Sequence, residues 1–83
     1  MQRSRFQIIM YNLPGQGENE AWNRPSHIES QYVDSMHEAE TTASFLAQQF
    51  NRVQVYLVGE QGHEALFEYL NGRLHLRNGY VWV

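Results

Sequence analysis

The chain contains no cysteine, and this absence excludes two classes of small protein. Its 83 residues can form neither a disulfide-stabilised scaffold nor a zinc site with thiolate ligands. Long apolar runs are also missing: none approaches the ~18 residues of a membrane-spanning helix, and the N-terminus lacks the apolar core of a signal peptide. We therefore expect a soluble, cytoplasmic protein with no membrane partner, folded as a single domain over residues 1–83 because the chain is too short for two cores.

Lysine is absent as well, so every basic side chain is an arginine. The formal net charge is −3, and carboxylates are concentrated between residues 18 and 40, beginning with Glu18 and Glu20. This acid-rich segment predicts a protein partner with a basic surface, attracted mainly through faster association. The negative charge makes a nucleic-acid partner unfavourable, because phosphate neutralisation dominates that kind of binding.

Motifs for catalysis, metal binding and phosphate binding are missing from the sequence. Gly15-Gln16-Gly17 opens like a nucleotide-binding loop, but Glu20 stands where the third glycine is needed and would repel an anion. The four histidines never pair three or four residues apart, as metal ligands on a helix do. No nucleophile elbow surrounds any serine. We therefore expect no cofactor, no metal, no catalytic residue and no enzymatic activity.

Two Asn-Gly pairs, Asn71-Gly72 and Asn78-Gly79, are the most informative feature that is present. Asn-Gly between apolar runs is the strongest local signal for a two-residue β-hairpin, because a type I′ turn needs positive φ at both central residues. The two turns predict a C-terminal meander of three strands, with Arg77 facing Tyr80 across the second turn.

The meander has two faces, because strand side chains alternate with a period of two. Burying unpaired arginine or glutamate would cost several kcal/mol, so the uncharged face is predicted to be the core. That core face consists of Ala65, Phe67, Tyr69, Leu74, Leu76, Val81 and Val83. The outward face consists of Leu66, Glu68, Leu70, Arg73, His75, Arg77, Tyr80 and Trp82, joined by Tyr56 and Val58 from the preceding strand.

Residues 64–70 also fit a short helix, with Leu66, Phe67 and Leu70 on one side and Gly72 as its stop. The alternation of Phe67 and Tyr69 ahead of the Asn-Gly pair favours the strand. The hairpin between residues 73 and 83 is expected under either interpretation.

The rest of the chain predicts two more strands, a loop and a helix. Residues 5–11 and 53–58 alternate as strands do, and residues 12–34 form a long irregular loop. Ser35 and Glu38 have the spacing of a capping box, so a helix should run from about 35 to 51. The expected order is β-α-β-β-β-β, with the first two strands parallel.

These elements predict a two-layer α+β domain, in which one helix packs on a mostly antiparallel five-stranded sheet that ends in a C-terminal meander. The outward face of the meander is the best candidate for function, because a mixture of Trp, Tyr, Arg and Leu is typical of binding hot spots. The alternative is that the long loop covers this face with Trp22, Ile28, Tyr32 and Val33. The candidate partner-binding residues are Leu66, Leu70, Arg73, His75, Arg77, Tyr80 and Trp82, together with Glu18, Glu20 and Trp22 from the acidic loop.

These observations favour a small non-catalytic protein-binding module, an inhibitor or adaptor of the kind that phages and mobile elements direct against larger host complexes. A homodimer through the C-terminal edge strand is compatible with this role, because Val83 ends that strand without a charged residue that would block pairing. One alternative is a sheet that binds single-stranded nucleic acid, with arginines near phosphates and aromatic rings on bases. A small dimeric enzyme is the other.

Overall fold

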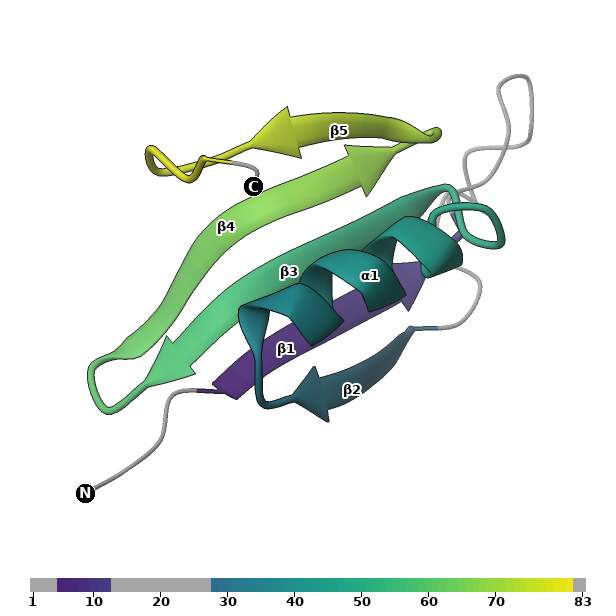
Figure 1. Cartoon of the computed structure of the whole chain (residues 1–83). Coiled ribbons are helices and arrows are strands. Elements are labelled where there is room, and N and C mark those ends of the chain that lie inside the picture. Colours follow the sequence, from purple (N-terminus) through teal and green to yellow (C-terminus); the bar gives the residue numbers. More distant parts are fainter. Residues whose placement is uncertain (1–4, 13–27, 82–83) are drawn as a thin grey trace, which may run out of the picture.

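The computed structural model describes residues 5–12 and 28–81, and it has two layers (Figure 1). In chain order the elements are β1 Arg5–Tyr11, β2 Glu29–Val33, α1 Met36–Leu46, β3 Arg52–Gly59, β4 Gly62–Leu70 and β5 Arg73–Leu76. The strands form one antiparallel sheet in the order β2-β1-β3-β4-β5, and α1 packs against β1, β2 and β3. The expected two-layer α+β architecture is confirmed, and residues 64–70 belong to a strand rather than to the alternative helix.

The segment expected to be an irregular loop contains strand β2. Its sequence has little apolar alternation of its own, but it pairs along β1 from Val33 opposite Phe6 to Glu29 opposite Met10. This extra strand reverses the chain, so β1 and β3 are antiparallel and the expected parallel arrangement is wrong. The observed order is β-β-α-β-β-β, in which α1 joins β2 to β3 across β1. Residues 13–27 lie outside the described residues.

Helix α1 begins where the sequence predicts and ends earlier. Ser35 is its N-cap, and the Ser35 hydroxyl oxygen accepts a hydrogen bond from the Glu38 N–H at 3.1 Å. The regular helix stops at Leu46 rather than near residue 51, and residues 47–49 form a turn. Because Ala39 and Ala43 are small and buried, the helix can lie close to the sheet.

The core lies between α1 and the sheet, where every second strand residue points toward the helix. In β3, Val53 and Val55 have no exposed surface, and Leu57 packs beside them. The buried apolar residues are Phe6, Ile8, Met10, Val33, Ala39, Ala43, Val53, Val55, Leu66 and Phe67, with Leu46, Ala47, Phe50, Leu57, Tyr69, Leu74 and Tyr80 packed against them.

A bulge in β4 changes the face on which the residues before it lie. Val55 pairs with Phe67, but the next residue of β3, Tyr56, pairs with Ala65, so Leu66 is an extra residue in β4. Leu66 and Phe67 are both buried, with exposed fractions of 7% and 1%. The expectations that Leu66 points outward and Ala65 inward are therefore wrong, because one inserted residue shifts the period-two alternation.

Both Asn-Gly pairs form turns, as the sequence predicts. The φ angles are 52° and 81° at Asn71-Gly72, and 51° and 74° at Asn78-Gly79, which is the backbone a type I′ turn requires. The first turn joins β4 to β5. The second is closed by a hydrogen bond of 2.9 Å from the Tyr80 N–H to the Arg77 carbonyl, after which the chain leaves the sheet.

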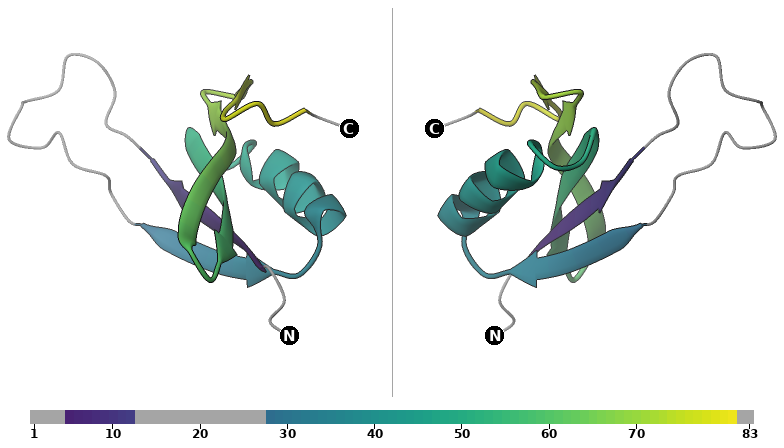
Figure 2. Two further views of the ribbon diagram at one scale, coloured as in Figure 1. Left: turned by 90° about the vertical axis from the view of Figure 1, so that its left-hand side faces the viewer. Right: turned by 90° about the vertical axis from the view of Figure 1, so that its right-hand side faces the viewer.

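Residues 80 and 81 do not continue the meander as a third strand. The Ala65 carbonyl accepts a hydrogen bond from the Asn78 side-chain amide at 2.7 Å, and the Leu66 carbonyl accepts one from the Arg77 N–H at 2.8 Å. After the second turn, the chain passes to the helix side of the sheet (Figure 2). Arg77 therefore faces Tyr80 across the turn as expected, but the expected third strand is absent from the described residues, and β2 and β5 are the edge strands of the described sheet.

Tyr80 packs on the core side rather than pointing outward as expected. Its ring stacks on Phe67 with the ring centroids 5.1 Å apart, and its hydroxyl donates a hydrogen bond to the buried Glu40 of α1. Burial raises the pKa of the Tyr80 hydroxyl above its ordinary value, and the Glu40 carboxylate adds to this effect. Tyr80 points inward rather than outward because the buried Glu40 carboxylate needs a hydrogen-bond donor, which the Tyr80 hydroxyl supplies.

Candidate binding face

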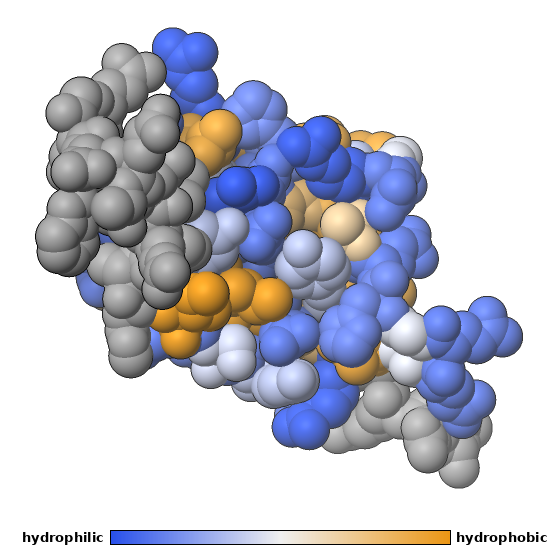
Figure 3. Space-filling view, turned by 180° about the vertical axis from the view of Figure 1, so that it is seen from behind, coloured by the Kyte–Doolittle hydropathy of each residue, from blue (hydrophilic) through white to orange (hydrophobic). Residues whose placement is uncertain are grey.

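The face of the sheet that turns away from α1, here called the open face, is not covered by any element that the structure describes (Figure 2). Every second strand residue contributes to it, as Arg52, Gln54 and Tyr56 do on β3. Figure 3 shows apolar side chains at several places on this face, among polar ones. One row of neighbours crosses the whole sheet through Ser30, Ile9, Gln54, Glu68 and His75.

All the arginines in the described part of the chain belong to the open face. They are Arg5, Arg52, Arg73 and Arg77. Among the carboxylates of the described strands, only Glu68 shares this face, while Asp34 reaches Arg5 at 3.6 Å from the end of β2. The open face is therefore locally positive, although the chain as a whole carries a formal charge of −3.

Tyrosine rings lie beside these arginines. The guanidinium carbon of Arg5 is 5.3 Å from the Tyr32 ring centroid, and that of Arg52 is 5.9 Å from the Tyr11 ring centroid, within the range of a cation–π contact. Tyr56 meets a histidine of β4 edge to face, with the ring centroids 6.4 Å apart. Tyrosine offers a large contact area at a low cost in side-chain entropy, which suits a surface that binds a partner.

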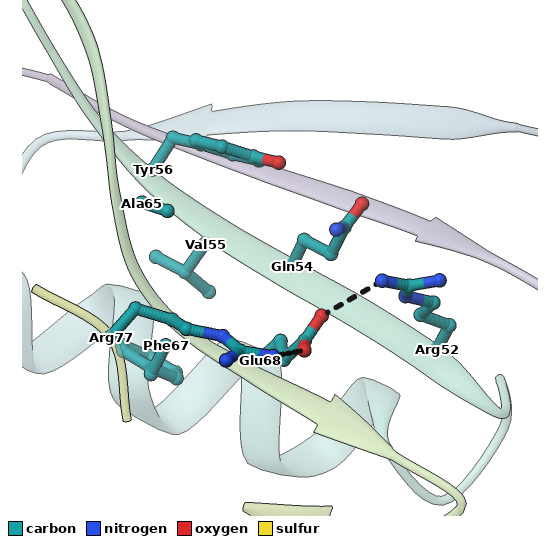
Figure 4. Close-up of a pocket in the computed structure, with 8 residues that line it drawn as sticks. All are labelled: Arg52, Gln54, Val55, Tyr56, Ala65, Phe67, Glu68 and Arg77. Carbon is teal, nitrogen blue, oxygen red and sulfur yellow. Dashed lines mark hydrogen bonds and ion pairs between the residues drawn. The ribbon is translucent and has the colours of Figure 1, made fainter. Parts of the chain in front are cut away.

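A hollow of about 140 Å³ lies on the open face beside the bulge (Figure 4). Arg52 and Arg77 approach the carboxylate of Glu68 from opposite sides: Arg52 donates a hydrogen bond to Oε1 at 3.2 Å, and Arg77 donates one to Oε2. The residues around the hollow are Arg52, Gln54, Val55, Tyr56, Ala65, Phe67, Glu68 and Arg77. The bulge shapes this site, because the extra residue interrupts the regular pairing of β3 and β4 there.

Glu68 is ionised at neutral pH although only 8% of its side chain is exposed. Burial alone would raise its pKa, because it disfavours the charged form. The hydrogen bonds and positive charges of Arg77 and Arg52 outweigh burial and hold the pKa of Glu68 below its ordinary value of 4.5. The hollow therefore contains two guanidinium groups and one carboxylate at pH 7.

Part of the contact surface expected from the sequence is brought together. Leu70 pairs with Arg73 and His75 pairs with Glu68, and Arg77 follows on the same face. Leu66 and Tyr80 are excluded, because both pack against the core. Tyr56 and Val58 belong to the open face, as expected. The remaining candidates, Trp82, Glu18, Glu20 and Trp22, lie outside the described residues.

The alternative in which the loop covers this face is wrong for Val33. Val33 lies in the core, and its exposed fraction is 8%. Ile28 and Tyr32, which were expected to pack over the meander, are 59% and 45% exposed, and Tyr32 belongs to β2 at the far edge of the sheet. Trp22 is outside the described residues.

Sequence reasoning missed the contribution of β1 and the cluster around Glu68. Arg5 and Tyr11 alternate with the buried residues of β1, so this alternation was the available signal for their place on the open face. No local pattern joins Arg52 to Glu68, which is 16 residues further along the chain. Their contact depends on the pairing of β3 with β4.

The described residues contain no group of three His, Cys, Asp or Glu side chains placed to hold a metal ion. No helix in the same part of the chain is both long and apolar enough to cross a membrane. No protein-family model, curated protein or solved structure matches this chain. Its function therefore has to be argued from the geometry of the open face.

Proposed function

We propose that this chain is a small non-catalytic protein-binding module that docks on its partner through the open face. The observation that carries the proposal is the composition of that face: tyrosine rings and guanidinium groups lie side by side on a sheet surface that no described element covers. Tyr and Arg are the residues that binding hot spots favour. A rigid sheet also holds these side chains in place before binding, which limits the entropy lost on association.

The charge of the open face supports a partner that is acidic where it docks. Arg73 is exposed there, and Arg52 and Arg77 share a single carboxylate. A basic partner, as the acid-rich segment predicts, would instead suit the helix side, where Glu38 is exposed. We favour the open face because its polar and aromatic residues are cross-strand neighbours and so form one continuous surface.

A module of this kind would act as an inhibitor or adaptor on a larger protein complex. Its effect would come from occupying a surface that the complex needs, or from linking two proteins. Affinity would depend on a few aromatic and arginine contacts near the middle of the face, since a minority of interface residues usually carries most of the binding energy.

A photo-crosslinking experiment compares the two sides of the molecule. The crosslinkable amino acid p-benzoylphenylalanine replaces either Tyr32 on the open face or Phe45 on α1, which are 45% and 58% exposed. Each variant is irradiated in lysate of the native host, and the protein in any adduct is identified by mass spectrometry. The crosslinking is then repeated with that protein in purified form. The proposal expects a discrete adduct from position 32 and none of the same mass from position 45.

A matched open-face variant tests whether such an adduct is specific. Arg73→Glu reverses one exposed charge without touching the core, and it should reduce the yield from position 32 severalfold. An adduct formed only from position 45, or a yield from position 32 that Arg73→Glu leaves unchanged, would rule out docking through the open face.

The gathering of arginine and tyrosine on one face also favours a second candidate function, the binding of single-stranded nucleic acid. Aromatic rings on a sheet can stack on bases while arginines neutralise phosphates. Fluorescence anisotropy with a labelled oligothymidylate at low salt tests it. Binding that Tyr56→Ala weakens by at least about fivefold, the lower end of the ~1–3 kcal/mol that stacking contributes per base, would support this function; no rise in anisotropy would reject it.

A further inference from the structure

The hollow on the open face has an excess of positive charge. Arg52 and Arg77 both bind Glu68, and each takes one of its two carboxylate oxygens. One carboxylate neutralises only one of the two guanidinium groups. The other residues around the hollow, Gln54 and Tyr56 among them, carry no charge.

The hollow also has more hydrogen-bond donors than acceptors. The Nε of Arg52 is buried, and it has no acceptor within the part of the chain that the structure describes. The side-chain oxygen of Gln54 already accepts a hydrogen bond from the Tyr11 hydroxyl at 3.4 Å, so the NH₂ group is the part of this amide left to donate. A guanidinium has five N–H donors and no acceptor, and a buried donor without an acceptor is unfavourable.

We propose that this hollow receives a single acidic side chain, an aspartate or glutamate, from the protein partner that docks on the open face. This inference rests on the proposed function and identifies the chemistry of its central contact. One added carboxylate would balance the charge, giving two guanidinium groups and two carboxylates. Arginine pairs with a carboxylate through two parallel hydrogen bonds, which fixes the orientation of the incoming group.

The size of the hollow fits this ligand. Its volume of about 140 Å³ is several times the ~30 Å³ that one water occupies in the liquid, so a carboxyl group with its short carbon stem can enter. Tyr56 and Ala65, which are partly exposed, supply apolar surface at the hollow for that stem. Bulges are frequent beside functional sites because they redirect side chains, as this one does.

A single carboxylate is favoured over a nucleic-acid backbone by the charge of Glu68. This carboxylate stays in the hollow and would repel a continuous line of phosphates. The net excess of one positive charge matches one monoanion. A nucleic acid is therefore an alternative outcome of the test rather than part of the proposal.

NMR of the arginine side chains tests the inference directly. The Nε–H signals of Arg52, Arg77 and Arg73 are followed while a capped hexaglutamate peptide is added, with a capped hexaglutamine peptide as the matched control. The signals of Arg52 and Arg77 should shift together along one binding curve. The signal of Arg73, which is on the same face but outside the hollow, reports non-specific ion pairing and should shift much less.

Two variants separate this site from general charge attraction. Arg77→Gln leaves Arg52 and Glu68 as a neutral pair, and it should weaken hexaglutamate binding at least tenfold. Glu68→Gln removes the carboxylate that competes for both arginines, so binding should become severalfold tighter. Arg77 is more than half exposed, so Arg77→Gln keeps the test decisive even if Glu68→Gln fails to fold.

The outcomes distinguish failure of this inference from failure of the proposed function. If hexaglutamate leaves Arg52 and Arg77 unmoved, or moves Arg73 as much, the hollow is not a carboxylate site, whereas crosslinking from position 32 can still succeed. If oligothymidylate moves the arginine signals and hexaglutamate does not, the second candidate function replaces it. Equal shifts with hexaglutamine would also overturn the proposal.

Discussion

Glu68 is a buried carboxylate that binds two arginines of the open face. It is 6% exposed, and it holds the guanidinium groups of Arg52 and Arg77 in place. We expect Glu68→Gln to lower the free energy of unfolding at pH 7 by about 1–2 kcal/mol, because hydrogen bonds to charged groups are lost. Urea denaturation followed by circular dichroism measures this, and Arg73→Gln, which changes an exposed charge of the same face, is the control.

The stabilities of wild type and Glu68→Gln should depend differently on pH in the acid range. The pKa of Glu68 is near 4.5 in the unfolded chain and lower in the folded one. Its stabilising contribution is therefore complete above the unfolded value and is lost as the pH falls through the folded value. The difference in unfolding free energy between wild type and Glu68→Gln should shrink below about pH 4, and a difference that stays constant would contradict the ionised pair.

Tyr80 joins the C-terminal segment to α1 through Glu40 and to β4 through Phe67, and substitutions can separate these two contacts. Tyr80→Phe removes only the hydroxyl that binds Glu40, and we expect a loss of about 1–2 kcal/mol in unfolding free energy because Glu40 is buried. Tyr80→Ala also removes the ring stacked on Phe67, so it should cost roughly 2–4 kcal/mol. Val81→Ala, at a side chain that is 73% exposed, should be nearly neutral.

Alkaline pH gives an independent check on the Tyr80 contact. Because the pKa of Tyr80 is raised in the folded state, its contribution is present below the ordinary value of 10.0 and is lost as the pH rises above it. Wild type should therefore lose more stability than Tyr80→Phe above about pH 10. Equal losses would mean that the hydroxyl is not held against Glu40.

At the level of single elements, the turn that joins β4 to β5 needs a backbone conformation that glycine adopts most easily. Gly72 has a φ of 81°, and a methyl group added there would contact nothing, so any cost of Gly72→Ala comes from strain in the turn. We expect a loss of about 1 kcal/mol. Gly59→Ala is the matched control, since it also has open space but no positive φ, and it should be neutral. Thermal denaturation of both variants measures the difference.

The elements that the sequence predicts correctly are those marked by local patterns. The Asn71-Gly72 hairpin follows from the φ angles that a type I′ turn needs, and the start of α1 follows from the Ser35 cap. The alternation of Val53 and Val55 gives the inward face of β3. Each of these signals lies within a few residues, so no knowledge of distant partners is needed to interpret it.

The elements that were missed or misplaced depend on distant partners. Strand β2 is held by its pairing with β1 rather than by an apolar pattern. The bulge at Leu66 shifts the alternation of side chains in β4 by one residue, and a regular period of two does not predict such a shift. Tyr80 turns inward because Glu40, 40 residues earlier, is buried beside it. The predicted outward placement is therefore confirmed for Leu70, Arg73, His75 and Arg77, and it is wrong for Leu66 and Tyr80, which these long-range contacts control.

At the level of the whole molecule, charge is divided between the two sides of the sheet. The described arginines lie on the open face, whereas the carboxylates of α1, Glu38 and Glu40, lie on the other side. The net charge of −3 is therefore not the local charge that a partner encounters at either surface. The face that approaches the partner sets the electrostatic contribution to the rate of association.

This separation of charge distinguishes two ways in which charge could change the rate of association. The rate could depend on the charge of the open face alone, or on the net charge of the whole chain. Arg73→Gln makes the chain one unit more negative, and Glu38→Gln makes it one unit less negative. Both side chains are exposed, and glutamine at position 38 keeps the spacing of the capping box. If docking occurs through the open face, Arg73→Gln should slow association with the crosslinked partner by roughly two- to fivefold at low salt, and Glu38→Gln should change it little. Stopped-flow measurements at several salt concentrations separate this result from a net-charge effect, in which the two variants would change the rate by similar factors in opposite directions.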